Sequence, residues 1–220
     1  MPSSSIAEQV DTFNEGFTEQ IGPQLSAVFH TEQSDLRAAG LPGSVARVGD
    51  RLPDADLLTP TGEPTTLGET LGDGPAVLVF YRGAWCPYCN LTLRTYQQEL
   101  LPRLDALGAR LVAVSPQTPE GSEAAIANGE LAFPVRSDPG NALAARLGIV
   151  TEPSAEARQA HTQLGFDVAD SNADESARIP FPSVFVVDVD RVIRFADVQV
   201  DYTARTEVAT IVDAVTALTA

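Results

Sequence analysis

The 220-residue sequence contains no lysine, because all 14 of its basic residues are arginine. Without a side-chain amine, Schiff-base chemistry and lysine nucleophiles are excluded. Positive charge of any kind is scarce, since 30 acidic residues leave a formal net charge of −16. Nucleic acids and anionic membrane surfaces are recognised by positively charged patches, so neither is an expected partner.

Cysteine and histidine are almost as rare. The only cysteines are Cys86 and Cys89, and the only histidines are His30 and His161. A structural zinc site needs four ligands, and the two histidines lack the spacing of a zinc motif, which makes zinc a minor alternative. Secreted disulfide scaffolds carry more cysteines, and a bridge across CxxC closes too small a loop to add much stability. The pair is therefore interpreted as reactive, with no metal or organic cofactor expected.

Long apolar runs are absent as well. The longest lies around residues 76–81, far short of the ~20 residues that span a bilayer. The first residues lack the basic and apolar segments of a signal peptide. These features predict a cytoplasmic protein, and the apolar fraction of 44% is ordinary for a globular domain.

The apolar pattern changes once along the chain. Residues 1–43 are interpreted as an N-terminal extension, in which 5–38 are expected to form two short amphipathic helices separated at Pro23. Residues 44–220 are expected to form one domain, with an insertion at about 151–180 that holds one helix and a polar loop. Strands are predicted at 76–81, 110–115, 133–136, 184–187 and 192–195, and helices at 87–107, 119–128, 141–147 and 204–218. This order predicts an α/β sandwich.

The segment Phe-Tyr-Arg-Gly-Ala-Trp-Cys-Pro-Tyr-Cys-Asn (80–90) ends a strand and begins a helix. With Cys86 as the N-cap, Pro87 falls at the first helical position, where its missing N–H costs nothing. The Cys86 sulfur is then expected to accept hydrogen bonds from the backbone N–H groups of Tyr88 and Cys89, and the helix dipole favours a thiolate. A thiol pKa lowered from about 8.5 to about 6 raises the thiolate fraction at pH 7 from ~3% to ~90%. Cys89, one turn further in, is expected to be less exposed and suited to resolving.

Several neighbours are candidates for shaping this site. Arg82 is the nearest permanent positive charge in sequence, although such an arginine is often only a surface charge. Trp85 and Tyr88 either shape the site or are ordinary core aromatics. Pro182 precedes a predicted buried strand, where a trans-proline is the usual occupant; given the CxxC pair, we favour a cis-proline that packs against the two cysteines.

The strand–turn–helix segment around Cys86-Pro-Tyr-Cys89 resembles a thioredoxin-fold active site, and its tetrapeptide is common in glutaredoxins. Beyond it, residues 48–218 are similar to the AhpC/TSA peroxiredoxin group. The similar segments are Val48–Pro53, Val112–Gln117, Phe133–Pro139 and Phe185–Asp190. The resemblance implies a thioredoxin-like three-layer α/β/α sandwich with a mixed central sheet, to which the N-terminal helices are added.

The resemblance also implies an activity. The Cys86 thiolate would attack a hydroperoxide and become a sulfenic acid, and Cys89 would condense with it to form a disulfide. A thioredoxin-like protein or a low-molecular-weight dithiol would then reduce this disulfide. Five further residues are expected to shape the site: Arg82, Trp85, Pro87, Tyr88 and Pro182.

Alternatives remain open at the level of sequence. Gly83 and Val79 stand where peroxiredoxins usually carry a threonine and a proline. A disulfide reductase of the thioredoxin or glutaredoxin kind, without significant peroxidase activity, is therefore the first alternative, and a non-catalytic thioredoxin-fold binding protein is the second. The N-terminal helices are expected either to cover the sheet or to form a homodimer interface.

Overall fold

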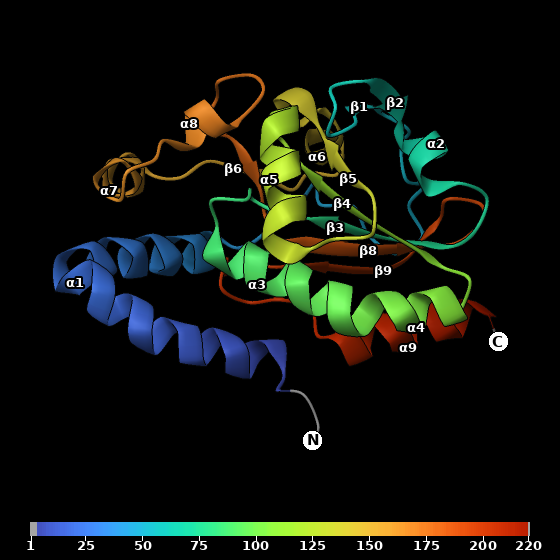
Figure 1. Cartoon of the computed structure of the whole chain (residues 1–220), viewed down its shortest axis with the longest axis horizontal. Coiled ribbons are helices and arrows are strands. Elements are labelled where there is room, and N and C mark those ends of the chain that lie inside the picture. Colours follow the sequence, from blue (N-terminus) through green and yellow to red (C-terminus); the bar gives the residue numbers. More distant parts are fainter. Residues whose placement is uncertain (1–3, 220) are drawn as a thin grey trace.

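The structure is a computed structural model in which residues 4–219 are described (Figure 1). The first three residues of the predicted extension 1–43 and the last residue of the predicted domain 44–220 lie outside the described residues. A seven-stranded sheet has the order β2-β1-β5-β4-β3-β8-β9. The strands are β1 (Asp56–Leu58), β2 (Pro64–Thr66), β3 (Ala76–Phe80), β4 (Arg110–Ser115), β5 (Val135–Ser137), β8 (Ser183–Val187) and β9 (Ile193–Val198). β3, β4 and β5 pair in parallel and all the other pairs are antiparallel, so the sheet is mixed.

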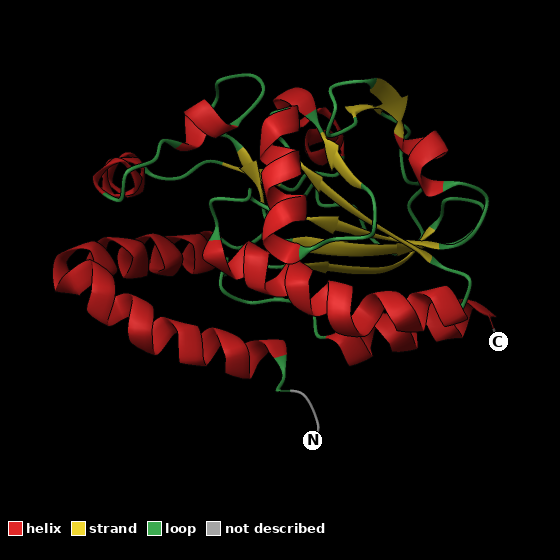
Figure 2. Cartoon of the chain, in the orientation of Figure 1, coloured by secondary structure: helices red, strands yellow, loops and turns green. Residues whose placement is uncertain are grey.

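Helices cover both faces of the sheet (Figure 2). Every residue of β3 is buried, and successive side chains alternate between two apolar clusters. Val77 and Val79 face the cluster beneath α3 (Pro87–Thr95), α4 (Leu101–Ala106), α5 (Pro119–Gly129) and α9 (Val208–Thr219). Leu78 and Phe80 face the cluster beneath α2 (Leu67–Leu71) and α6 (Ala142–Arg146). The predicted three-layer sandwich with a mixed sheet is confirmed.

The helix predicted at 87–107 is interrupted. A π-helical turn, η1 (Tyr96–Leu100), separates α3 from α4. Pro102 is the second residue of α4, a position where the backbone N–H has no acceptor within that helix, so its absence breaks no hydrogen bond of α4. The irregular backbone hydrogen bonds lie in the preceding π-helical turn. The interruption therefore comes just before Pro102, at the end of α3 opposite the cysteines.

The N-terminal segment forms one bent element, α1 (Ile6–Ala39), which Figure 1 shows as two arms of a V. Gly22 has φ +78°, a left-handed backbone that glycine adopts without strain, and Pro23 follows it at the bend. A capping box between Ser5 and Glu8 begins the first arm. The two helices predicted within 5–38 are thus present as the two arms of α1.

The insertion is more structured than the sequence predicts. α7 (Ala155–Gln163) is the expected helix, and the polar loop also holds α8 (Val168–Ser171) and the strand β7 (Ile179–Pro180), which pairs with β6 (Val150–Thr151). Such short elements carry no measurable apolar period, and β1 and β2 were missed for the same reason. In the part of the chain that is described, no helix is long and apolar enough to cross a membrane.

Candidate active site

The two cysteines lie at the start of α3, after the turn that follows β3. Cys86 is the N-cap and Pro87 the first residue of the helix, as predicted. The prediction that the Cys86 sulfur accepts hydrogen bonds from the first backbone N–H groups of the helix is wrong, because the Cys86 side chain makes no such bond. Instead, the carbonyl oxygen of Cys86 accepts bonds from the N–H groups of Cys89 and Asn90 at 3.0 and 3.1 Å. Glycine at position 83 allows the Trp85 side chain to pack against the backbone, since a Cβ at this position would clash with the indole nitrogen.

Both cysteines are free thiols and both are enclosed. Cys86 is 0% exposed and Cys89 1%, so burial does not distinguish them as predicted. Their surroundings do. Cys86 belongs to the wall of a cavity of about 560 Å³, whereas Cys89 accepts a hydrogen bond from Nη2 of Arg205, 3.4 Å from its sulfur.

The two thiols differ in the direction of their pKa shifts. Burial by itself opposes ionisation of Cys89, but a hydrogen bond from the Cys86 thiol and the charge of Arg205 outweigh it and lower the pKa of Cys89 to about 5. Burial, together with the bond to the Cys89 thiolate, raises the pKa of Cys86. The two shifts thus run in opposite directions, with the pKa of Cys89 lowered and that of Cys86 raised, whereas the helix dipole alone favours a thiolate at Cys86.

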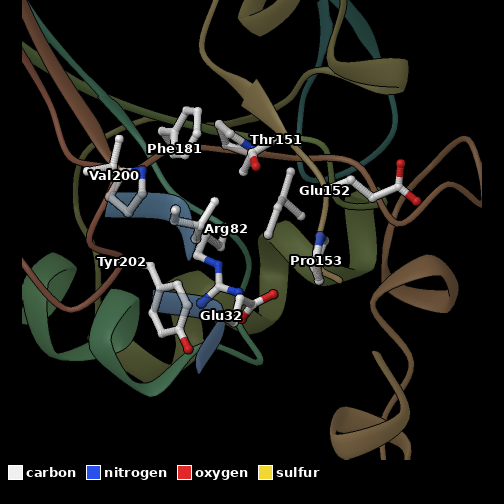
Figure 3. A pocket seen from close by; sticks show the side chains of 12 residues that line it. Glu32, Arg82, Thr151, Glu152, Pro153, Phe181, Val200 and Tyr202 are labelled. Atoms are coloured by element: carbon white, nitrogen blue, oxygen red, sulfur yellow. The ribbon is translucent and has the colours of Figure 1, made fainter. Parts of the chain in front are cut away.

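Arg82 is a buried charge rather than a surface one. It is 4% exposed, and its guanidinium carbon lies 4.9 Å from the ring centre of Trp85 and 4.2 Å from that of Tyr202. Figure 3 shows it beside Tyr202 and Glu32. Burial opposes the charge, but the neighbouring sulfurs raise the pKa of Arg82, which keeps it protonated. A permanent cation therefore stands next to the cysteine pair.

The cavity beside Cys86 is lined by parts of the chain that are far apart in sequence. Half of its lining residues come from α1, and the others come from residues 82–88, 161–166 and 201–203. Its apolar walls include Phe13, Phe17, Ile21, Phe29, Trp85, Leu164, Phe166 and Tyr202. Tyr88 ties the two sides together, because its hydroxyl donates to Oδ1 of Asn14 at 2.7 Å. We call this space the chamber.

His161 is a chamber residue that the sequence did not single out. Its ring lies 5.6 Å from Trp85, 4.9 Å from Phe166 and 5.3 Å from Phe29. Burial and the nearby charge of Arg82 lower the pKa of His161 to about 4. The ring is therefore neutral at pH 7. A signal was present in the sequence, since His161 follows Ala157 by one helical turn on the buried side of α7.

Pro182 corrects another prediction. Among the described residues there is no cis peptide bond, so the favoured cis-proline is wrong and the ordinary trans-proline before a strand is right. The chain is extended on both sides of Pro182, which accepts a hydrogen bond from the N–H of Gln199 at its carbonyl oxygen. Pro182 lines two small pockets, one of them shared with Arg82, and not the chamber.

Metal-ligating side chains are scattered. No group of three or more His, Cys, Asp or Glu side chains within residues 4–219 is arranged to hold a metal ion. Cys86 and Cys89 have no third ligand among the described residues beside them.

Comparison with known families and structures gives one consistent fold. The AhpC/TSA family model matches residues 48–196. No curated protein matches the sequence. Peroxidoxin BcpB from Mycobacterium tuberculosis is 22% identical, with 79% of this chain and 96% of that chain covered and a TM-score of 0.59.

Two further solved structures are similar at the same level. A peroxiredoxin-like protein from Aquifex aeolicus is 16% identical, with 79% and 88% of the two chains covered and a TM-score of 0.62. A yeast mitochondrial 1-Cys peroxiredoxin is 21% identical, with 80% and 77% covered and a TM-score of 0.61. At these identities the likeness shows the fold, and the family match covers the central sheet and the cysteine pair but not α1 or α9.

Proposed function

The chain belongs to the AhpC/TSA family, and on that premise we propose that it reduces hydroperoxides with Cys86 as the attacking thiol and Cys89 as the resolving thiol. The family membership makes it a thiol peroxidase of the peroxiredoxin kind in broad terms. The assignment of roles to the two cysteines is the further step. One observation carries it: Cys86 lines the chamber, whereas Cys89 is not among the residues that line it.

The neighbouring charges support the same assignment. A hydroperoxide that reaches Cys86 meets the guanidinium of Arg82, which stabilises negative charge as it develops on the leaving oxygen. The Cys89 thiolate accepts the proton of the Cys86 thiol through the hydrogen bond between them. Cys86 then becomes a nucleophilic thiolate by giving its proton to Cys89, with no proton exchanged with solvent.

The atoms balance in two steps. The Cys86 sulfur attacks one peroxide oxygen, the O–O bond breaks, and the alkoxide takes the proton held on Cys89 and leaves as an alcohol. The Cys89 thiolate then attacks the Cys86 sulfenic acid, the S–S bond forms, and the displaced hydroxide takes a solvent proton to become water. The cysteine pair carries both electrons, so the reaction needs no metal or organic cofactor.

The remaining parts of the proposal concern partners. We propose that a thioredoxin-like protein or a small dithiol reduces the disulfide between the two cysteines, and that the protein acts in the cytoplasm. Because both sulfurs are enclosed, a protein reductant requires α1 to move aside, whereas a small dithiol of chamber size does not. α1 packs on α3 and α7 of its own chain; cover of the sheet and a homodimer interface, the two roles expected for the N-terminal helices, both stay predictions.

The direct test is a one-equivalent titration. Reduced protein is mixed with one equivalent of cumene hydroperoxide and the free thiols are counted over seconds, with the fluorescence of Trp85, the only tryptophan, as a stopped-flow signal. Loss of both thiols at a rate far above that of a free thiol is expected. Thiol loss no faster than that of free cysteine refutes the peroxidase.

Two variants test the roles. Cys89→Ser is expected to stop at the Cys86 sulfenic acid, which dimedone traps, whereas Cys86→Ser is expected to lose peroxide reduction altogether. A Cys86→Ser protein with full activity, or dimedone labelling at residue 89 in the wild type, reverses the assignment.

A disulfide reductase remains the second candidate, and the CxxC pair at the start of α3 favours it. The enclosed sulfurs count against a protein disulfide as substrate, because neither is reachable by another chain in this arrangement. Rapid reduction of insulin without peroxide consumption would select this function. If neither substrate reacts, a non-catalytic binding protein is the correct interpretation.

A further inference from the structure

The chamber is an addition to the family fold. Its α1 residues and residues 201–203 lie outside the matched range 48–196, and these added segments supply more than half of the lining. Its volume of about 560 Å³ falls in the ~300–1,000 Å³ range of cavities that hold small organic ligands. Hydrogen peroxide, a molecule only slightly larger than water, needs no such space.

The chemistry of the wall indicates an amphipathic guest. Aromatic and aliphatic side chains from both arms of α1 face those of Trp85 and Phe166 across the space. Between them, the side-chain amide of Gln33, Nε1 of Trp85 and Nδ1 of His161 are buried without a hydrogen-bond partner in the described structure. Buried polar atoms are usually paired, so these groups give the otherwise apolar wall a polar side.

We propose that the chamber binds the apolar body of a bulky organic hydroperoxide and makes the enzyme selective for such substrates over hydrogen peroxide. This inference rests on the proposed function. The hydroperoxide group lies against Cys86 and Arg82, and the aromatic or aliphatic body fills the space beneath α1. After O–O cleavage, the product alcohol occupies the same space.

The expected selectivity follows from apolar burial. One methylene group in a hydrophobic pocket changes the specificity constant by about 10–200-fold. A cumyl group buries several such units against the chamber wall. We therefore expect kcat/KM for cumene hydroperoxide to exceed that for hydrogen peroxide by at least about tenfold.

A filled chamber tests this selectivity. Ser26 is buried on the second arm of α1 and lines the chamber, whereas the neighbouring Ala27 is exposed and does not. Ser26→Phe is expected to lower the ratio of the two specificity constants by about tenfold, and the matched Ala27→Phe to leave it as in the wild type. An unchanged ratio in a folded Ser26→Phe protein overturns the proposal.

Binding without chemistry provides a second measurement. The Cys86→Ser protein is titrated with 2-phenylpropan-2-ol, the alcohol product, and the fluorescence of Trp85 is followed. A saturable change is expected, and it should be absent with tert-butanol at the same concentrations because that molecule fills little of the chamber. A linear or absent response overturns the proposal even where Ser26→Phe fails to fold.

The two proposals fail in different ways. If Cys86 reacts rapidly with hydrogen peroxide and shows no preference for the bulky substrate, the chamber proposal is wrong and the peroxidase stands. If no peroxide reacts faster than with a free thiol, the peroxidase is wrong, and saturable binding of the alcohol then shows that the chamber takes an organic ligand for another reaction.

A separate observation concerns Arg205, which also lies outside the matched range. Its Nη2 donates to the sulfur of Cys89, and its Nη1 donates to the carbonyl oxygens of Tyr202 and Ala204. The guanidinium is thus fixed by the loop before α9. Arg82, the Cys86 thiol and the Tyr81 hydroxyl are the other titratable or charged groups that interact with Cys89.

We infer that Arg205 holds Cys89 as a thiolate and so sets the rate at which the Cys86 sulfenic acid is converted to the disulfide. In that step the Cys89 thiolate displaces hydroxide from Cys86, and hydroxide takes a solvent proton. The nucleophile of this step is the ionised thiol, and the cation beside the Cys89 sulfur favours that form.

Substitution of Arg205 is expected to affect the second step. Arg205→Met should slow disulfide formation about tenfold at pH 7, prolong dimedone trapping, and move the pH profile of this step to higher pH; Arg205→Lys should restore much of the rate. Arg194→Met, at an exposed arginine paired with Asp188, is the control. An unshifted pH profile in Arg205→Met overturns the inference, since a merely structural role does not set a titration.

Discussion

The central sheet and α1 are stabilised in different ways. In β3 and β8 every residue is buried. In α1, a much longer element, only Ile6, Val10, Ser26, Glu32 and Gln33 are buried, and three of these are polar. The sheet is therefore held by apolar burial and fixes the cysteine pair, whereas α1 adds few apolar side chains to the core, is held by polar contacts as well, and leaves much of its inner side to the chamber.

The polar contacts of α1 are spread along its length. The carboxylate of Glu207 accepts hydrogen bonds from the backbone N–H groups of Ile6 and Ala7 at 3.0 and 2.9 Å. Further along, Asn14 accepts the Tyr88 hydroxyl, Glu32 accepts the N–H of Ser154, and Arg37 pairs with Asp201. Each such contact contributes about 0.5–1.5 kcal/mol, so no single one decides the position of α1.

The largest expected effect lies in the sheet. Phe185 is fully buried and packs edge-on against Phe80 with ring centres 5.9 Å apart. Phe185→Ala is expected to lower the free energy of unfolding by about 3–5 kcal/mol, measured by guanidinium denaturation. Phe29→Ala on α1 should cost only about 1 kcal/mol, because its ring faces the chamber. Equal costs would break the comparison between the two regions.

Acid is expected to loosen the chamber before the sheet. The folded structure lowers the pKa of His161 to about 4, below its unfolded value of about 6.5, so the unfolded state binds more protons between these pH values. Stability is then fully present above about pH 6.5 and decreases as the pH falls towards 4, by about 2 kcal/mol at pH 5. His161→Phe should remove this dependence from thermal unfolding measured between pH 7 and 4.5.

The control for this titration is the other histidine. His30→Gln, at an exposed position of α1, should keep the wild-type profile. A His161→Phe protein with the same acid sensitivity as the wild type would assign the effect to other groups.

A smaller effect is expected at the start of α1. Glu207→Gln removes a negative charge that faces the first N–H groups of the helix, which should cost about 1 kcal/mol. Hydrogen exchange should speed up in residues 6–21 and remain slow in the sheet. Asp213→Asn, on the exposed side of α9, is the matched control. Faster exchange in β3 as well would show that α1 and the sheet unfold together.

The smallest effect is expected at Arg37, whose side chain is 52% exposed in its pair with Asp201. Arg37→Ala should cost about 0.5 kcal/mol or less and should be masked by 0.5 M salt. A cost above about 1 kcal/mol by denaturation would mean that this pair fixes the second arm of α1.

Local patterns in the sequence were sufficient for much of the fold. The continuous apolar run of β3, the alternation of strands with helices and the separation of two helices at Pro23 each depend on a few neighbouring residues, and each was predicted. Pro87 after Cys86 fixed the start of α3 in the same way. The short elements β1, β2 and α8 escaped because three or four residues show no period.

The sequence by itself determined the α/β sandwich and the cysteine pair at the start of a helix, because backbone propensity, apolar period and proline position are local properties; its resemblance to the AhpC/TSA group added the thioredoxin-like arrangement. Only the tertiary structure decided that Arg205 lies on Cys89, that His161 lies beside Trp85, and that Pro182 is trans. The charge on each sulfur depends on groups brought together across more than 100 residues of chain, and no local pattern encodes that distance.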